Sequence, residues 1–304
     1  MFWKGLDMPK FDTKQDSRIK SANYSHVELI AEIGSNANGD FERARQLVET
    51  ACSCGADIIK VQLFAADTLW RKDHPRHAET LKVETKPEWI KPLKEIIEKH
   101  GKEFLCTPFS PFAIDVLEEV GIKRYKIASG DVTYRPLLQA VALTGKPVLL
   151  SVGFSTFAEI HKAIEWLRPS GSREDITLLW CVGDYPTTPA RANYPAVLDL
   201  IQEFVMQYNC QIGLSSHLKE WWLDLVPMAY KISVIEKHFD LFDSAGIEHG
   251  HSLSPHDFTL FSQAVRDAEK SLTRYDFPSP DDDETRTLCR RDPRDWLRPE
   301  RRDK

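Results

Sequence analysis

Short apolar runs alternate with amphipathic stretches along the chain from Val27 onward. The apolar runs are typical of parallel strands that are buried on both faces, and the stretches between them have the apolar spacing of helices that cover such a sheet. The predicted strands are residues 27–34, 58–64, 103–109, 124–129, 147–153, 176–182, 211–217 and 232–239. The predicted helices are residues 40–53, 87–100, 111–120, 135–143, 156–167, 195–208, 220–230 and 255–272.

This alternation predicts an α/β fold, and the repeated strand–helix unit has the count and overall length of a (β/α)8 TIM barrel. A doubly wound open sheet is the competing fold. It often carries a glycine-rich nucleotide motif after the first strand, but the segment from Gly34 to Gly39 has the wrong spacing for that motif. We therefore expect a barrel over residues 27–274, a short N-terminal extension over residues 1–26, and a charged tail containing proline and arginine over residues 275–304.

Composition narrows the class of protein. Hydrophobic residues make up 42% and charged residues 28% of the chain, and the net charge is −6, so neither nucleic acid nor an anionic membrane is an expected partner. No apolar run approaches the roughly 20 residues that span a bilayer, and the first 20 residues lack a signal-peptide core. The six cysteines are scattered through the sequence, which indicates reduced thiols and a cytoplasmic protein.

Two histidines are the strongest functional signal. His217 closes the seventh predicted strand and His238 closes the eighth. The carboxyl ends of the strands meet at one face of a barrel, where such enzymes keep their active sites. A single histidine at a strand end is more often structural, but two at consecutive ends, beside other reactive residues, indicate a site. A pair of neutral imidazoles suits a divalent metal ion.

Two lysines lie inside apolar strands, where an unpaired charge is costly to bury. Lys60 and Lys126 therefore each need an anion. One interpretation is a structural ion pair with Glu32 or Asp131. The other is a pocket for a ligand that carries phosphate and carboxylate groups, with hydroxyl donors from neighbouring strand ends. Those hydroxyl groups belong to Thr107, Ser129, Ser151 and Ser215. Both interpretations stay open on the residues alone.

A series of motifs in a fixed order resembles the sialic acid synthase family, the N-acetylneuraminate synthases and their relatives. The motifs are IAEIGSNANGD at residues 30–40, GADIIKVQ at 55–62, CTPF at 106–109, YKIASG at 125–130, LSVG at 150–153, DYP at 184–186, GLSSH at 213–217, VIEKHF at 234–239 and EHGHSLSP at 248–255. Each motif alone is weak, but their order is highly specific. The resemblance covers residues 27–272.

The resemblance implies a TIM barrel that condenses phosphoenolpyruvate with an aldehyde sugar such as an N-acetylhexosamine, giving a 2-keto-3-deoxy sugar acid and phosphate. It implies that Glu32, His217 and His238 are catalytic, and that the two histidines hold Mn²⁺ or Mg²⁺. The implied phosphoenolpyruvate ligands are Lys60, Gln62, Thr107, Lys126, Ser129, Ser151 and Ser215. The implied acceptor ligands are Asn36, Asp131, Tyr185 and Glu248.

The chain also departs from the family pattern. Ala37 stands where the first loop usually has histidine, and Ser216 stands where aspartate usually precedes the strand-end histidine. The family usually continues into a C-terminal antifreeze-like domain, and this sequence ends where that domain would begin, so we expect a barrel alone. The family implies a homodimer, but the missing domain leaves the oligomeric state open. The alternatives are a metal-dependent aldolase or lyase on the same barrel, and a non-catalytic scaffold.

Overall fold

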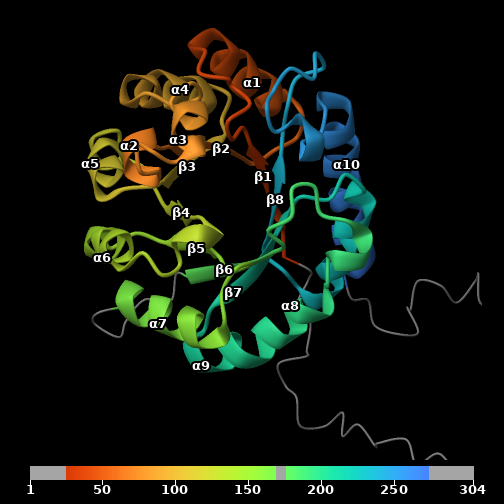
Figure 1. Cartoon of the computed structure of the whole chain (residues 1–304). Coiled ribbons are helices and arrows are strands. Elements are labelled where there is room, and N and C mark those ends of the chain that lie inside the picture. Colours follow the sequence, from red (N-terminus) through yellow and green to blue (C-terminus); the bar gives the residue numbers. More distant parts are fainter. Residues whose placement is uncertain (1–24, 169–175, 274–304) are drawn as a thin grey trace, which may run out of the picture. The chain divides into compact units, whose positions relative to one another are not determined.

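Eight parallel strands close into a barrel in the computed structural model, which describes residues 25–168 and 176–273 (Figure 1). Each strand pairs with its neighbours in chain order, and β8 pairs with β1. The strands are β1 (Glu28–Glu32), β2 (Ile58–Leu63), β3 (Glu103–Pro108), β4 (Tyr125–Ile127), β5 (Val148–Ser151), β6 (Ile176–Cys181), β7 (Gln211–Ser216) and β8 (Val234–His238). The predicted TIM barrel is therefore confirmed. Most of the predicted extension and all of the predicted tail lie outside the described residues.

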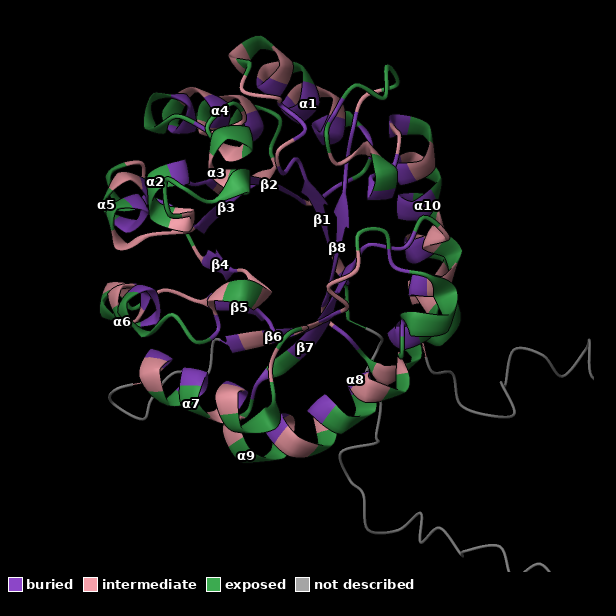
Figure 2. Cartoon of the chain, in the orientation of Figure 1, coloured by how far each residue is buried: buried purple, intermediate pink, exposed green. Residues whose placement is uncertain are grey.

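Helices surround the barrel (Figure 1). They are α1 (Phe41–Ser53), α2 (Ala66–Leu69), α3 (Pro75–Thr80), α4 (Pro87–Lys99), α5 (Pro111–Glu119), α6 (Arg135–Thr144), α7 (Phe157–Leu167), α8 (Pro195–Leu200), α9 (Met206–Tyr208) and α10 (Pro255–Leu272). The strands are almost wholly buried, while the helices alternate between buried and exposed residues (Figure 2). Within the described residues, no helix combines the length and apolar character needed to cross a bilayer.

Three predicted details were wrong. The helix predicted over residues 220–230 is a 3₁₀ helix, Trp221–Tyr230, which contains Pro227 and therefore lacks one backbone donor. The helix predicted over residues 195–208 is interrupted by a π-helical turn, Ile201–Val205. The short helices α2 and α3 lie in a segment where no helix was predicted.

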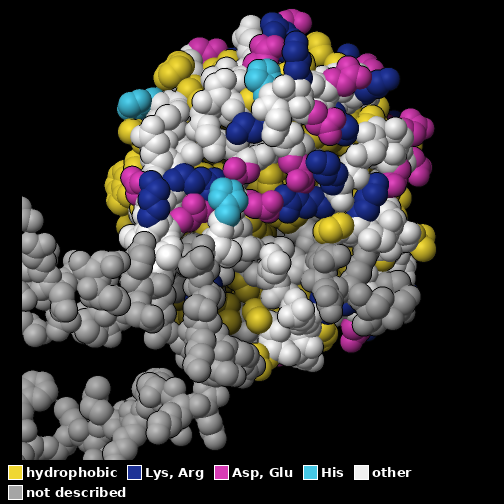
Figure 3. All heavy atoms as spheres, turned by 180° about the vertical axis from the view of Figure 1, so that it is seen from behind, with side chains coloured by type: hydrophobic (Ala, Val, Ile, Leu, Met, Phe, Trp, Pro, Cys, Tyr) yellow, Lys and Arg dark blue, Asp and Glu magenta, His cyan; other side chains and the backbone are white. Residues whose placement is uncertain are grey.

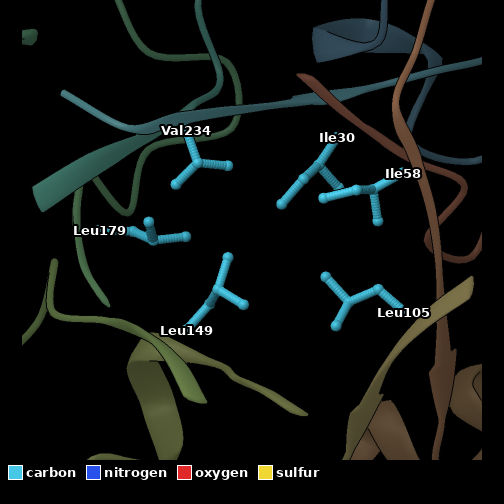
Figure 4. Packing of buried hydrophobic residues seen from close by; sticks show 6 residues of the cluster. All are labelled: Ile30, Ile58, Leu105, Leu149, Leu179 and Val234. Carbon is cyan, nitrogen blue, oxygen red and sulfur yellow. The ribbon is translucent and has the colours of Figure 1, made fainter. Parts of the chain in front are cut away.

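The barrel interior is filled in layers. One layer consists of apolar side chains that point toward one another across the barrel (Figure 4). They are Ile30, Ile58, Leu105, Leu149, Leu179 and Val234. Because alternate residues of a strand face the same side, the residues two positions further along face the same interior nearer the carboxyl ends. Those residues are Glu32, Lys60, Thr107, Ser151, Cys181 and Glu236. The apolar layer thus forms the floor of a polar chamber.

β7 crosses the apolar layer at Gly213. A Cβ atom there would lie only 2.4 Å from Val234 Cγ1 and 2.6 Å from Leu179 Cδ2. The glycine therefore lets the two larger side chains fill the layer, as close packing of a barrel core requires.

The amino ends of the strands carry a different arrangement. Arg124, just before β4, pairs with Glu28 of β1 and Glu103 of β3, at 2.6 Å in each case. Figure 3 shows the back of the molecule, where cationic and anionic side chains lie interleaved across the surface. Paired charges of this kind stabilise the end of the barrel where the strands begin. The candidate site is the polar chamber at the opposite end, where the strands finish.

Candidate active site

The two interior lysines converge on one carboxylate. Lys60 Nζ lies 2.5 Å from Glu32 Oε2 and 3.1 Å from Glu236 Oε2. Lys126 Nζ lies 3.6 Å from Glu236 Oε1. All four side chains are buried. The ion pair between Lys60 and Glu32 is the one that the structural interpretation of the sequence named, whereas Glu236 joins both lysines and was not among the predicted ligands.

Burial decides the electrostatics of this group. Loss of solvation lowers the pKa of Lys60 to about 8, although the charge of Glu236 opposes the shift. Burial acts in the opposite sense on Glu236, but Lys126 and Lys60 outweigh it and hold the pKa of this carboxyl well below its usual value. Glu236 therefore remains an anion that keeps two ammonium groups side by side.

Most of the predicted phosphoenolpyruvate ligands lie around these lysines. Lys60 donates to Thr107 Oγ1 at 3.2 Å, and Gln62 donates to Glu32 Oε1 at 3.0 Å. Ser215 donates its hydroxyl hydrogen to Glu236 Oε1 at 2.8 Å. The structure thus brings residues from β1, β2, β3, β7 and β8 into one connected network.

The remaining hydroxyl groups lie at the ends of β4 and β5. Ser129 Oγ accepts from the Gly153 amide at 3.1 Å. The Ser151 hydroxyl is buried, and it has no hydrogen-bond partner among the described residues. A buried polar atom without a partner is costly, so this hydroxyl is a candidate contact for a ligand in the chamber.

Asp131 follows Ser129 on the turn after β4. One of its carboxylate oxygens is buried, with no hydrogen-bond partner in the described part of the chain. Burial raises the pKa of Asp131 to about 6, and Lys126 only partly offsets that rise. This carboxyl group can therefore exchange a proton near neutral pH.

Three imidazole rings gather beside the chamber. The ring centroids of His217 and His238 are 5.2 Å apart, and that of His251 lies 5.7 Å from His217 and 4.5 Å from His238. His217 and His238 were predicted as metal ligands from the sequence, whereas His251 was not, although it lies in the motif at residues 248–255. The signal in the sequence is that His251 shares this motif with Glu248, which was itself a predicted ligand.

Hydrogen bonds fix the orientation of two of these rings. His217 Nδ1 lies 2.8 Å from the Val182 carbonyl oxygen, which can only accept, so Nδ1 carries the hydrogen and Nε2 has a free lone pair. His238 Nδ1 lies 2.9 Å from Glu248 Oε2. A carboxylate that accepts from the far nitrogen of a histidine commonly orients that ring toward a metal ion. Burial lowers the pKa of His217 far below its usual value, so this ring is neutral.

Glu248 is itself held in place. Its backbone amide donates to Asn36 Oδ1 at 2.8 Å, and Asn36 donates its own amide hydrogens to Phe239 O and Ser252 Oγ. Gly34 faces the Glu248 carboxylate so closely that a Cβ atom would collide with it. Asn36 is fully buried and uses its amide within the protein, where it supports Glu248, and its contact with the acceptor stays a prediction.

Tyr185 forms an open wall of the site. Its ring centroid lies 4.0 Å from that of His217 and 5.0 Å from that of His251, yet 55% of the residue is exposed. The tyrosine therefore covers the histidines on one side and faces solvent on the other, where a second substrate could approach.

A second buried ion pair lies behind the histidines. Lys237 Nζ is 2.8 Å from Asp224 Oδ2, and both side chains are fully buried. Ser216 and Tyr194 donate to Asp224 Oδ1 at 2.7 and 2.5 Å. Ser216 thus lies outside the polar chamber, and Asp224 supplies a carboxylate beside the position where the family pattern usually has aspartate.

Three side chains could together hold a metal ion. Candidate ligand atoms of His238, Glu248 and His251 all lie within 4.8 Å of one another. Nε2 of His251 is buried and has no hydrogen-bond partner among the described residues. The donor set, with neutral imidazole and carboxylate, fits a divalent cation.

Residues 47–276, more than half of the chain, match the model of the NeuB family. The chain belongs to this family. An N,N'-diacetyllegionaminic acid synthase of Campylobacter jejuni is 33% identical over 261 residues, which cover 80% of this chain and 77% of that protein. A synthase of the same name from Legionella pneumophila is 34% identical over 284 residues, covering 86% of this chain and 78% of that protein.

A solved structure agrees with these relatives. The N-acetylneuraminic acid synthetase of Leptospira borgpetersenii, crystallised with citrate, superposes on this NeuB-family chain with a TM-score of 0.79 at 28% identity. The superposition covers 88% of this chain and 93% of that one. The resemblance to sialic acid synthases that the ordered motifs indicate is therefore confirmed.

Proposed function

We propose that this NeuB-family protein condenses phosphoenolpyruvate with the aldehyde group of an N-acetylated sugar. Carbon 3 of phosphoenolpyruvate forms a bond to the aldehyde carbon, water adds at carbon 2, and phosphate leaves, giving a 2-keto-3-deoxy sugar acid. The observation that carries the proposal is the pair of buried lysines beside a group of imidazoles, at the end of the barrel where strand ends converge.

The donor side is the polar chamber. Lys60 and Lys126 supply the positive charge for the phosphate and carboxylate groups of phosphoenolpyruvate, and burial strengthens this attraction. Hydrogen bonds to the two anionic groups come from Gln62, Thr107, Ser129, Ser151 and Ser215. Glu236 holds the lysines in place before the substrate arrives, so little reorganisation is needed on binding.

Proton transfer falls to two carboxylates. Glu32 lies 2.5 Å from Lys60 and is the register partner of His238, so it stands between the lysines and the imidazoles. We assign to Glu32 the proton released when water adds at carbon 2. Asp131, whose pKa is raised to about 6, exchanges a proton with the acceptor at its unpartnered oxygen.

The imidazole side receives the acceptor. His217 and His238 are proposed to hold Mn²⁺ or Mg²⁺, because each uses Nδ1 for a hydrogen bond and keeps Nε2 for an ion. When bound, the ion stabilises the negative charge that develops on the aldehyde oxygen. Tyr185 provides an exposed ring against which the sugar can lie, and Glu248 offers a carboxylate to its polar groups.

The relatives narrow the class of acceptor. Two of them are named for a product that carries two N-acetyl groups, and the structural neighbour is named for a product that carries one. An aldehyde sugar with one or two acetamido groups is therefore the proposed acceptor, within a cytoplasmic carbohydrate biosynthesis pathway.

The test is release of phosphate from phosphoenolpyruvate with Mn²⁺, across a panel of singly and doubly acetamidated aldehyde sugars. We expect release that depends on one acceptor and is lost in the Lys126→Met and His217→Ala variants. Lys270→Met, which changes an exposed lysine on α10, is the matched control and should keep full activity. Cleavage of a keto sugar acid without phosphoenolpyruvate would instead identify an aldolase, and no binding of phosphoenolpyruvate would identify a scaffold.

A further inference from the structure

His251 reaches the imidazole group through a single tight turn. The turn is 3₁₀-helical over His249–His251, and Glu248 is the residue just before it. Side chains three residues apart in a 3₁₀ helix lie on the same side, so Glu248 and His251 face the same space. The His251 amide donates to the Glu248 carbonyl oxygen at 3.2 Å, and Ser252 donates to the same oxygen at 2.8 Å. These bonds hold the turn rigidly.

His249 on the same turn shows the contrast. Its side chain is 38% exposed, and its Nδ1 atom, which is also buried without a hydrogen-bond partner among the described residues, lies 3.4 Å from the Asp240 carboxylate. His249 is not part of the cluster formed by His238, Glu248 and His251. His251 is 7% exposed, and its buried Nε2 atom has no hydrogen-bond partner among the described residues. A ring nitrogen that is buried without a partner beside two other imidazoles and a carboxylate is explained if a cation binds to it.

We propose that His251 is a metal ligand, which together with His217 and His238 gives the site three imidazole nitrogens instead of two. Such a site binds Zn²⁺, Co²⁺ and Fe²⁺ much more tightly than Mg²⁺, and of the two ions expected from the sequence it selects Mn²⁺ over Mg²⁺. The inference rests on the proposed function, because it takes the metal at His217 and His238 as given.

The selectivity follows from ligand chemistry. Imidazole nitrogen suits Zn²⁺, Fe²⁺ and neighbouring transition metals, whereas Mg²⁺ prefers oxygen ligands and retains several waters. Each imidazole added to the site therefore strengthens binding of the transition metals more than binding of Mg²⁺. The centroids of the three rings lie within 6 Å of one another. The preference for transition metals over Mg²⁺ therefore comes from protein side chains and does not require the substrates.

The experiment measures metal binding without turnover. The full chain is stripped of metal and titrated with Co²⁺, Zn²⁺, Mn²⁺ and Mg²⁺ in the absence of substrates, with the visible absorption of bound Co²⁺ as an independent readout. His251→Gln is compared with His249→Gln, a change of the same kind two residues away. We expect His251→Gln to weaken Co²⁺ and Zn²⁺ binding by about tenfold or more, and to change the Co²⁺ spectrum, while His249→Gln leaves both unaltered.

A second variant guards against a folding defect. His251→Asp keeps a ligand but replaces nitrogen with oxygen, so it should lower the ratio of Zn²⁺ to Mg²⁺ affinity while the metal-free protein keeps its circular dichroism spectrum. Wild-type Co²⁺ binding and spectrum in folded His251→Gln would overturn the inference, and so would a wild-type protein that binds Mg²⁺ as tightly as Zn²⁺.

Failure of the proposed function has a different signature. In that case no acceptor releases phosphate from phosphoenolpyruvate with any of the four metals, while the effect of His251→Gln on Co²⁺ binding persists. Loss of the metal preference with intact phosphate release would instead overturn only the assignment of His251.

Discussion

The Lys60 ammonium group lies 3.1 Å from the Glu236 carboxylate, although β1 separates their two strands in the barrel. The same carboxylate also faces Lys126 at 3.6 Å. Two cations held this close in a buried chamber repel each other strongly. Glu236 thus stabilises the lysine pair in the folded state. Its single negative charge does not balance both ammonium groups, so the chamber can still attract an anionic ligand.

Glu236→Gln removes that compensation while keeping the shape of the side chain. We expect the ligand-free variant to lose about 3–5 kcal/mol of unfolding free energy, as when one partner of a buried pair is removed. Phosphoenolpyruvate should then stabilise the variant more than the wild type, because it supplies the missing negative charge. Chemical denaturation with and without phosphoenolpyruvate checks both effects.

Glu98→Gln is the control for that comparison. Glu98 pairs with Lys94 on the surface of α4, so its replacement should cost less than about 1 kcal/mol. Equal losses in the two variants would contradict the assignment of Glu236 as the compensating anion.

The activity should depend on pH through Lys60. Its pKa is lowered to about 8, so the ammonium form dominates below pH 8 and the neutral amine above it. Because the cation binds the substrate, kcat/KM for phosphoenolpyruvate should fall as the pH rises through 8. Lys60→Arg keeps its charge at every pH in that range, so it should abolish this fall even if its activity is lower. A fall near pH 8 that persists in Lys60→Arg would show that another group is responsible.

The buried pair behind the histidines should behave as a unit. Lys237→Met leaves the Asp224 carboxylate buried without its cation, and we expect a loss of about 3–5 kcal/mol. Asp224→Leu combined with Lys237→Met should cost less than the sum of the single changes, since no uncompensated charge remains. Unfolding by urea gives the unfolding free energies of the wild type, the two single variants and the double variant. If the losses in the single variants simply added up in the double variant, the two residues would not be coupled.

Gly213→Ala tests the packing of the apolar layer. The new methyl group would meet Val234 and Leu179, and overpacking of this kind typically costs about 1–3 kcal/mol. Gly250→Ala is a useful control, because a Cβ atom there has no neighbour within 4 Å and the backbone needs no left-handed conformation. Thermal unfolding should separate the two variants, and equal stability would contradict the layered core.

Much of this fold can be predicted from sequence because parallel barrels repeat one simple unit. The apolar run at residues 58–64 predicts β2, and Lys60 within it marks the chamber. Strand ends were predicted one or two residues too long, as at His217, because residues that enter the loop remain as buried as those in the sheet. The helix predicted over residues 220–230 differs for a local reason, the proline at position 227.

The site was harder to predict where its members come from elements far apart in sequence. Glu236 lies near the end of the eighth predicted strand, but nothing in a linear sequence shows that it reaches lysines on β2 and β4. Asn36 lies in a family motif, and only the structure shows that its amide is used to hold the Glu248 turn. His251 depends on a 3₁₀ turn whose geometry the sequence does not reveal.

The most direct test of the proposed reaction is nuclear magnetic resonance of the product formed from phosphoenolpyruvate labelled with ¹³C at carbon 3. The account predicts that this carbon becomes a methylene group bonded to the former aldehyde carbon of the sugar, in step with phosphate release. Labelled pyruvate together with unchanged sugar would show hydrolysis without carbon–carbon bond formation, and it would contradict the condensing mechanism.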